Sequence, residues 1–208
     1  MENIEINCHS SIKISFLGKN IYIDPYQISK DQKDADFLFI THDHYDHFSE
    51  EDILKIINEK TIIILPESCL SKIEEMNLSN TIVTVKPNSR YEVSDMKFQT
   101  IASYNINKLY HPKDSNFVGY LLELGKYKYF ITGDTDVNLE NKQVKCDYLL
   151  IPVGGEYTMD YKEAAMLTNL IKPTYAIPTH YKTIVGSDED ARKFKELLDS
   201  SIQCEILY

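Results

Sequence analysis

The chain has 208 residues, a net charge of −10 and 43% hydrophobic residues, a composition that suits one globular domain. No stretch of 18 apolar residues, no signal-peptide pattern and no basic tract is present, which disfavours a membrane protein and a nucleic-acid-binding protein. The cysteines are scattered and form no CxxC pair, so we expect reduced thiols in a cytoplasmic protein.

Short runs rich in β-branched and aromatic residues, bounded by turn residues, predict β-strands along most of the chain. The predicted strands cover residues 21–24, 37–40, 61–65, 81–85, 98–104, 118–124, 127–132, 148–151 and 175–177. Strands therefore dominate the predicted secondary structure.

Helices are predicted where a capping residue precedes an apolar stripe. Ser49 precedes a helix over 50–59, and Ser187 precedes a helix over 188–199. Asp160-x-x-Glu163 resembles a capping box ahead of a helix over 164–171, which Pro173 stops. Because helices follow several of the strands, an α/β arrangement of packed sheets flanked by helices fits best.

A cluster of histidines follows the apolar run at 37–40, in the order His42-x-His44-x-Asp46-His47. Neutral imidazole and carboxylate are good ligands for zinc and related divalent ions. In an extended segment His42 and His44 point to the same side, and a turn lets Asp46 and His47 face a second position. A solvated loop is the alternative, but its imidazoles would repel one another when protonated, and a metal relieves that repulsion.

This cluster resembles the signature of the metallo-β-lactamase superfamily, His-x-His-x-Asp-His after a strand. Three further landmarks occur in the order the family has them, each at the end of a predicted strand: Asp24-Pro25, Gly133-Asp134-Thr135 and Pro178-Thr179-His180. The resemblance spans about residues 9–182. It implies a four-layer αββα sandwich and a single domain over residues 1–208.

Within the superfamily, the chain resembles small proteins related to L-ascorbate-6-phosphate lactonase. That likeness rests on the segments His9-Ser10-Ser11, Tyr104-Asn105-Ile106-Asn107-Lys108, Gly133-Asp134-Thr135-Asp136 and Pro152-Val153-Gly154-Gly155. It implies a metal-dependent hydrolase that cleaves an ester, lactone or phosphodiester bond of a small molecule. Paired metals would lower the pKa of a bound water, and the resulting hydroxide would attack the substrate.

The resemblance also implies a set of metal ligands, and His42, His44, Asp46 and His47 form its catalytic core. The first metal takes His42, His44 and a third histidine. The second metal takes Asp46, His47 and His180, and Asp134 bridges the two metals. Asp46, although primarily a ligand, is also the candidate for protonating the leaving group.

The third ligand of the first metal departs from the family pattern, because Asn105 stands where the family places a histidine. His111 lies six residues later in the chain. We favour His111 because imidazole is a better ligand than a neutral amide oxygen, and we keep Asn105 as the alternative.

Asp24 and His9 are expected near the ligands. Asp24 is expected to accept a hydrogen bond from a metal-bound histidine, with a plain turn residue before Pro25 as the alternative. His9 is expected to orient a ligand or line the pocket, and a structural histidine is an equal alternative. Gly154 and Gly155 either permit close backbone approach to the site or form an ordinary loop.

The implied cofactor is a pair of divalent ions, with zinc favoured and manganese or iron as alternatives. A small-molecule substrate is the expected partner, with no nucleic acid and no membrane, and self-association stays open. Two other functions also stay open. One is a non-catalytic protein that binds or senses metal, and the other is a small phosphodiesterase or nuclease.

Overall fold

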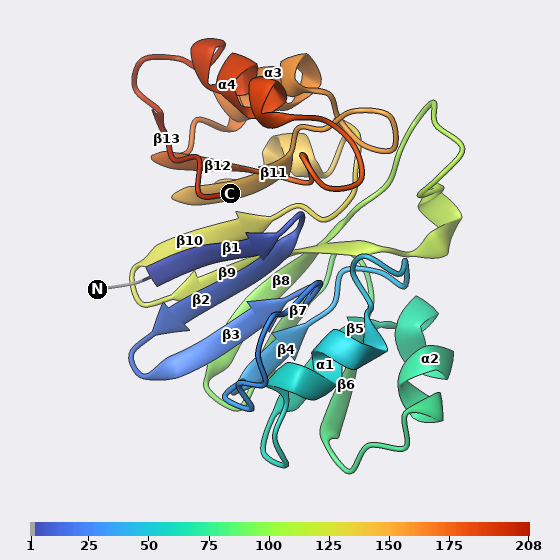
Figure 1. Ribbon diagram of the computed structural model, residues 1–208. Helices are drawn as coiled ribbons and strands as arrows, with labels where there is room; N and C mark the ends of the chain where they lie inside the picture. Colours follow the sequence, from blue (N-terminus) through green and yellow to red (C-terminus); the bar gives the residue numbers. More distant parts are fainter. Residues whose placement is uncertain (1–2) are drawn as a thin grey trace. The chain divides into compact units, whose positions relative to one another are not determined.

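The computed structural model describes residues 3–208, which divide into two compact units. The first unit extends to Val85 and includes Tyr208, and the second spans Lys86–Leu207. Each contains one β-sheet with helices (Figure 1). The prediction that residues 1–208 form one domain stays a prediction. None of the helices in residues 3–208 combines the length and the apolar character that crossing a membrane requires.

The first unit is built on a six-stranded sheet with the strands in sequence order. The strands are β1 (Asn3–Cys8), β2 (Ser11–Phe16), β3 (Lys19–Ile23), β4 (Phe37–Phe39), β5 (Ile62–Pro66) and β6 (Thr81–Val85). Strands β1 to β3 are antiparallel, and β3 to β6 are parallel. Parallel pairing puts the carboxyl ends of β3 and β4 at one edge, so the segments that follow them lie close together.

Two helices pack on this sheet, α1 (Glu50–Ile56) and α2 (Leu70–Glu75). Ile53 of α1 and Ile73 of α2 join Leu38 and other strand residues in one buried apolar cluster. Ser49 caps α1 by accepting a hydrogen bond from the backbone N–H of Asp52, as predicted, although α1 ends three residues before the predicted 59. Helix α2 was not predicted, because a helix of six residues is too short to show a helical repeat.

The second unit is built on a seven-stranded sheet in the order β13-β12-β11-β10-β9-β8-β7. The strands are β7 (Arg90–Val93), β8 (Met96–Ala102), β9 (Val118–Leu124), β10 (Tyr127–Ile131), β11 (Tyr148–Pro152), β12 (Tyr175–Thr179) and β13 (Gln203–Cys204). Strands β7 to β10 are antiparallel, and β10 to β13 are parallel. Strands β8, β10 and β12 therefore run the same way, and their carboxyl ends share one edge.

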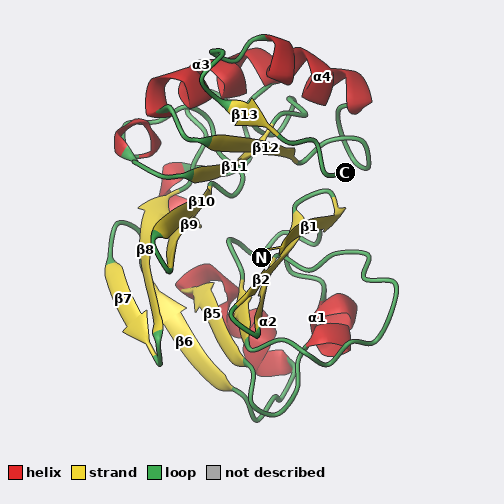
Figure 2. Cartoon of the chain, turned by 90° about the vertical axis from the view of Figure 1, so that its left-hand side faces the viewer, coloured by secondary structure: helices red, strands yellow, loops and turns green. Residues whose placement is uncertain are grey.

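Helices α3 (Tyr161–Ile171) and α4 (Asp188–Glu196) lie together beside β11 to β13 (Figure 2). The predicted capping box of Asp160 and Glu163 opens α3, and Lys172 ends it in a left-handed conformation just before Pro173. Helix α4 ends at Glu196, three residues before the predicted end.

Every predicted strand is present, within a few residues of its predicted bounds, but β1, β2, β7 and β13 were not predicted. In β1 and β2 apolar residues alternate with polar ones, as in Ser11-Ile12-Lys13-Ile14. The predicted strands are short runs rich in β-branched and aromatic residues, and in β1 and β2 the intervening polar residues interrupt such runs. Strand β13 has only two residues, too few for any pattern.

Candidate metal centre

The histidine cluster occupies the loop between β4 and α1 in the first unit. His42, Asp46 and His47 are buried, with 1%, 7% and 0% of their surface exposed. The backbone N–H groups of His47 and Phe48 donate to the carbonyl oxygen of His44 over 3.0 and 2.7 Å. This turn separates His42 and His44 from Asp46 and His47, as the spacing predicted.

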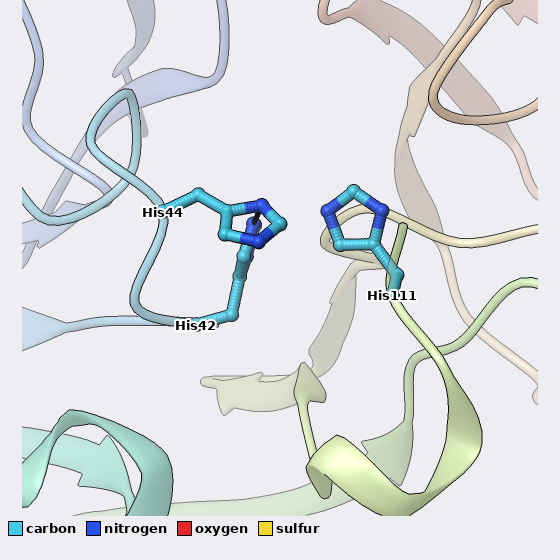
Figure 3. A group of neighbouring side chains, drawn as sticks. All are labelled: His42, His44 and His111. Carbon is cyan, nitrogen blue, oxygen red and sulfur yellow. Dashed lines mark hydrogen bonds between the residues drawn. The ribbon is translucent and has the colours of Figure 1, made fainter. Parts of the chain in front are cut away.

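His42 and His44 bring two ring nitrogens together (Figure 3). Nε2 of His42 lies 3.2 Å from Nδ1 of His44, and the rings meet edge to face with their centroids 4.6 Å apart. Two nitrogens bound tetrahedrally to one zinc ion are about 3.4 Å apart, since each Zn–N bond is about 2.0–2.1 Å. The pair therefore fits a shared divalent ion.

Asp24, which follows β3, holds the ring of His47. Its Oδ2 lies 2.7 Å from Nδ1 of His47, and its Oδ1 accepts the backbone N–H of Thr41 over 2.8 Å. Burial raises the pKa of the Asp24 carboxyl, while its contacts with His47 and Thr41 act in the opposite direction. With Nδ1 of His47 engaged, Nε2 remains for a metal, and it lies 3.5 Å from Oδ2 of Asp46.

Thr41 orients His42 through its hydroxyl, a role that sequence reasoning missed. Its Oγ1 lies 2.6 Å from Oδ2 of Asp24, which takes the hydroxyl proton, and 2.9 Å from Nδ1 of His42. Because the hydroxyl has only one proton to donate, it accepts from Nδ1–H of His42, and Nε2 of that ring is left with a lone pair. The position of Thr41 directly before the first ligand was the one available signal.

His9 lies in the turn between β1 and β2 and has none of its surface exposed. Its Nε2 is 3.5 Å from Oδ2 of Asp46. Of the roles considered for His9, orientation of a ligand is the one that this contact favours.

The second unit brings together three more of the expected ligands at the carboxyl ends of its strands. Oδ2 of Asp134 lies 3.0 Å from Nε2 of His180 and 3.4 Å from Nε2 of His111. All three residues are buried, with 1–3% of their surface exposed. One carboxylate group beside two imidazole nitrogens is the arrangement that a bridging ligand needs.

Asn105 and His111 are neighbours, because the loop between them closes on itself. The backbone N–H of Asn105 donates to the carbonyl oxygen of His111 over 2.8 Å. Nδ2 of Asn105 donates to the carbonyl oxygens of Tyr110 and Tyr157 over 2.9 and 2.6 Å. Its Oδ1 is buried and accepts no hydrogen bond from residues 3–208. Both residues therefore remain candidates for the third ligand of the first metal, and His111 is the one that contacts Asp134.

Hydrogen bonds fix the loop after β10 to the end of β8. Oγ of Ser103 donates to the carbonyl oxygen of Asp134 over 2.9 Å, and the N–H of Tyr104 donates to Oγ1 of Thr135 over 3.2 Å. The N–H of Asp136 donates to the carbonyl oxygen of Tyr104 over 3.1 Å. These bonds hold the Asp134 backbone at the edge of the sheet.

Gly154 allows the chain after β11 to pack closely against the backbone of His180. A Cβ atom at Gly154 would lie 2.2 Å from the carbonyl oxygen of His180, so no larger residue fits. The structure therefore favours close backbone approach over an ordinary loop.

Several of these residues share an uncommon backbone conformation. His9, Asp24, His111 and His180 have φ angles of 54°, 46°, 60° and 54°, in the left-handed region. Such residues cost roughly 1–3 kcal/mol each and cluster at functional sites.

Comparison with known proteins places these features in a family. Residues 3–180 match the family model described as the Beta-lactamase superfamily domain. A UPF0173 metal-dependent hydrolase of Caldivirga maquilingensis is 28% identical over 212 residues, which cover 92% of this chain and 87% of the relative.

Solved structures show the same fold. Igni18, a metallo hydrolase from the archaeon Ignicoccus hospitalis, has a TM-score of 0.81 at 19% identity and covers 99% of this chain and 94% of its own. CmlA, a diiron β-hydroxylase from Streptomyces venezuelae, has a TM-score of 0.79 at 13% identity, covering 100% of this chain and 53% of its own. The predicted α/β sandwich class is confirmed, and the relation to the lactonase stays a prediction.

Proposed function

We propose that this chain, which belongs to the metallo-β-lactamase superfamily and is a metal-dependent hydrolase, uses two divalent ions to cleave an ester, lactone or phosphodiester bond of a small molecule. The observation that carries the proposal is Asp134, whose Oδ2 lies within 3.4 Å of imidazole nitrogens of both His111 and His180. A buried carboxylate in that position suits a ligand shared by two ions.

In this proposal the first ion takes His42, His44 and His111, and the second takes Asp46, His47 and His180, with Asp134 between them. The contacts within each unit support these sets. His42 and His44 present nitrogens 3.2 Å apart, and Asp46 and His47 present ligand atoms 3.5 Å apart. Zinc is the favoured ion, and manganese or iron also suits these ligands.

When bound, the ions supply an activated water and polarise the bond to be cleaved. The chain's own residues hold that chemistry in place. Asp24 and Thr41 fix the tautomers of His47 and His42 so that Nε2 of each ring is the ligand atom. Asp46 is the carboxylate proposed to pass a proton to the leaving group. A cytoplasmic location and a small-molecule substrate are part of the same proposal.

Metal analysis combined with turnover tests the proposal. Purified protein should carry about two divalent ions per chain by mass spectrometry and should hydrolyse one class within a panel of esters, lactones and phosphodiesters. Asp134→Asn should lose metal and turnover together. Asp199→Asn is the matched control, because Asp199 lies past α4 and its exposed carboxylate pairs with Lys172 at 3.9 Å.

Two results would count against the proposal. Full metal content with unchanged hydrolysis in Asp134→Asn would remove the bridging role. Two tightly bound ions without turnover on any bond class would favour a protein that binds or senses metal. Turnover of phosphodiesters alone would agree with the proposal and would narrow it to a small phosphodiesterase.

A further inference from the structure

The loop that joins Asn105 to His111 exposes apolar side chains directly beside proposed ligands. Ile106, Leu109 and Tyr110 have 59%, 87% and 49% of their surface exposed. Exposed apolar groups gathered at one place are typical of a binding surface. Their position between Asn105 and His111 associates that surface with the metal centre.

Hydrogen bonds and ion pairs hold the loop in this conformation. Its two ends are joined by the 2.8 Å hydrogen bond from Asn105 N–H to the carbonyl oxygen of His111. In its middle, Lys108 bonds Asp136 and lies 3.6 Å from Glu163. Leu109 is held between these two contacts but buries almost none of its surface. Its side chain therefore adds little hydrophobic stabilisation to the fold.

The ion pairs of Lys108 also determine the charge that this loop presents to a substrate. Lys108 is the only cation in the segment 105–111, and its ammonium group is neutralised by Asp136 and Glu163. A phosphorylated substrate would therefore meet no available positive charge on this loop. An uncharged group would meet leucine, isoleucine and tyrosine.

Each unit also carries a pair of tyrosines next to its own proposed ligands. Tyr110 meets Tyr157 edge to face, with the ring centroids 5.2 Å apart and the planes at 90°. In the first unit Tyr45, between His44 and Asp46, meets Tyr26 at 6.1 Å and 76°. Tyr45 and Tyr110 have 63% and 49% of their surface exposed, and exposed aromatic rings suit contact with another flat group.

We propose that the part of the substrate that does not react is uncharged and apolar, with an aromatic group preferred, and that Ile106, Leu109 and Tyr110 select it. This inference rests on the proposed metal-dependent hydrolysis. It narrows the candidate substrates to aryl or other apolar esters and lactones, and it disfavours phosphorylated ones.

Binding of three hydroxamates to the metal-loaded protein tests the inference without any turnover. Acetohydroxamate, phenylacetohydroxamate and sulfoacetohydroxamate share the group that chelates divalent ions and differ in the part that would meet the loop, and a sulfonate is an anion that itself binds metal only weakly. By calorimetry, phenylacetohydroxamate should bind about tenfold more tightly than acetohydroxamate, the range expected for one aromatic contact. Sulfoacetohydroxamate should gain nothing over acetohydroxamate from its anionic group.

Leu109→Ser should bring the ratio of phenyl to methyl affinity to within about twofold of one, since the contact is lost. Leu17→Ser is the matched control and should keep the wild-type ratio. Leu17 is 88% exposed, like Leu109 at 87%, but lies in the turn between β2 and β3, at the opposite end of β3 from Asp24.

The outcomes separate this inference from the function on which it rests. Equal affinities for the phenyl and methyl probes, or tighter binding of the sulfonate probe, would overturn the substrate class while leaving the metal centre in place. Binding of none of the three probes would overturn the metal centre and this inference with it. A phenyl preference that survives Leu109→Ser and Ile106→Ser would overturn the role of the loop.

Discussion

The carboxylate of Asp24 lies 2.7 Å from Nδ1 of His47, although the two residues are 23 positions apart and follow different strands. Parallel pairing of β3 with β4 brings the two strand ends together. The contact fixes which nitrogen of His47 can face a metal, and both groups are buried from water. A buried hydrogen bond of this kind raises ligand basicity and holds the ring in one orientation.

Asp24→Asn should weaken metal binding by about 10–100-fold, the effect typical of removing a partner of a ligating histidine. The amide keeps the volume of the side chain but supplies one acceptor oxygen in place of two, and both Thr41 and His47 use those oxygens. Competition against a chelating dye measures the affinity. Asp31→Asn, at an exposed position of the following loop, is the control. Affinity within about twofold of wild type would contradict the assigned role.

Thr41→Val should weaken metal binding through His42. Valine has a similar shape to threonine and keeps the backbone N–H that Asp24 accepts, but it removes the hydroxyl 2.9 Å from Nδ1 of His42. We expect about a tenfold loss of affinity and a destabilisation of roughly 1–3 kcal/mol from the buried groups left without a partner. Thr41→Ser retains the hydroxyl and should restore both properties. Equal behaviour of the valine and serine variants would refute the role of the hydroxyl.

Gly154→Ala should displace the backbone of His180. The added Cβ would lie 2.2 Å from the carbonyl oxygen of His180 and 3.0 Å from Cγ2 of Val185. We expect a destabilisation of about 1–3 kcal/mol in urea unfolding, together with loss of metal. Gly18→Ala is a suitable control, because its Cβ meets no atom within 4 Å and only the φ of 81° is unfavourable. If the two variants bind metal equally well, the close approach is not what positions His180.

Protonation of the Asp52 carboxylate should make the protein less stable at acid pH. Burial acts to raise the pKa of Asp52, but hydrogen bonds from Lys55, Ser49 and the N–H groups of Gln27 and Ile28 outweigh it and lower the pKa below the ordinary 3.8. The carboxylate therefore stabilises the fold fully above that ordinary value, and the contribution is lost as the pH falls through the lower pKa of the folded state.

Asp52→Asn should accordingly cost roughly 1–3 kcal/mol at neutral pH and progressively less below about pH 4. Urea unfolding of the variant and the wild type across this pH range measures the difference. Glu51→Gln is the control, since the Glu51 side chain is 81% exposed and pairs with Lys55 at the surface. A difference that does not change with pH would show that the charge of Asp52 contributes nothing.

The sequence by itself predicted the elements that carry the strongest local signals. The apolar runs at 37–40 and 148–151 are strands, and the caps at Ser49 and Asp160 begin helices, because these features depend on neighbouring residues only. The spacing of His42 and His44 predicted rings on one side of an extended segment; the ring nitrogens do lie 3.2 Å apart, although the chain bends at residues 43 and 44.

Only the tertiary structure decided which distant residues meet. Asp24 reaches His47 because β3 pairs with β4, and Asp134 reaches His111 and His180 because β8, β10 and β12 end at one edge of a sheet. Sheet order and register depend on packing between segments far apart in the chain, which no local pattern encodes. The hydroxyl of Thr41 and the missing side chain of Gly154 acquire their roles only from those contacts.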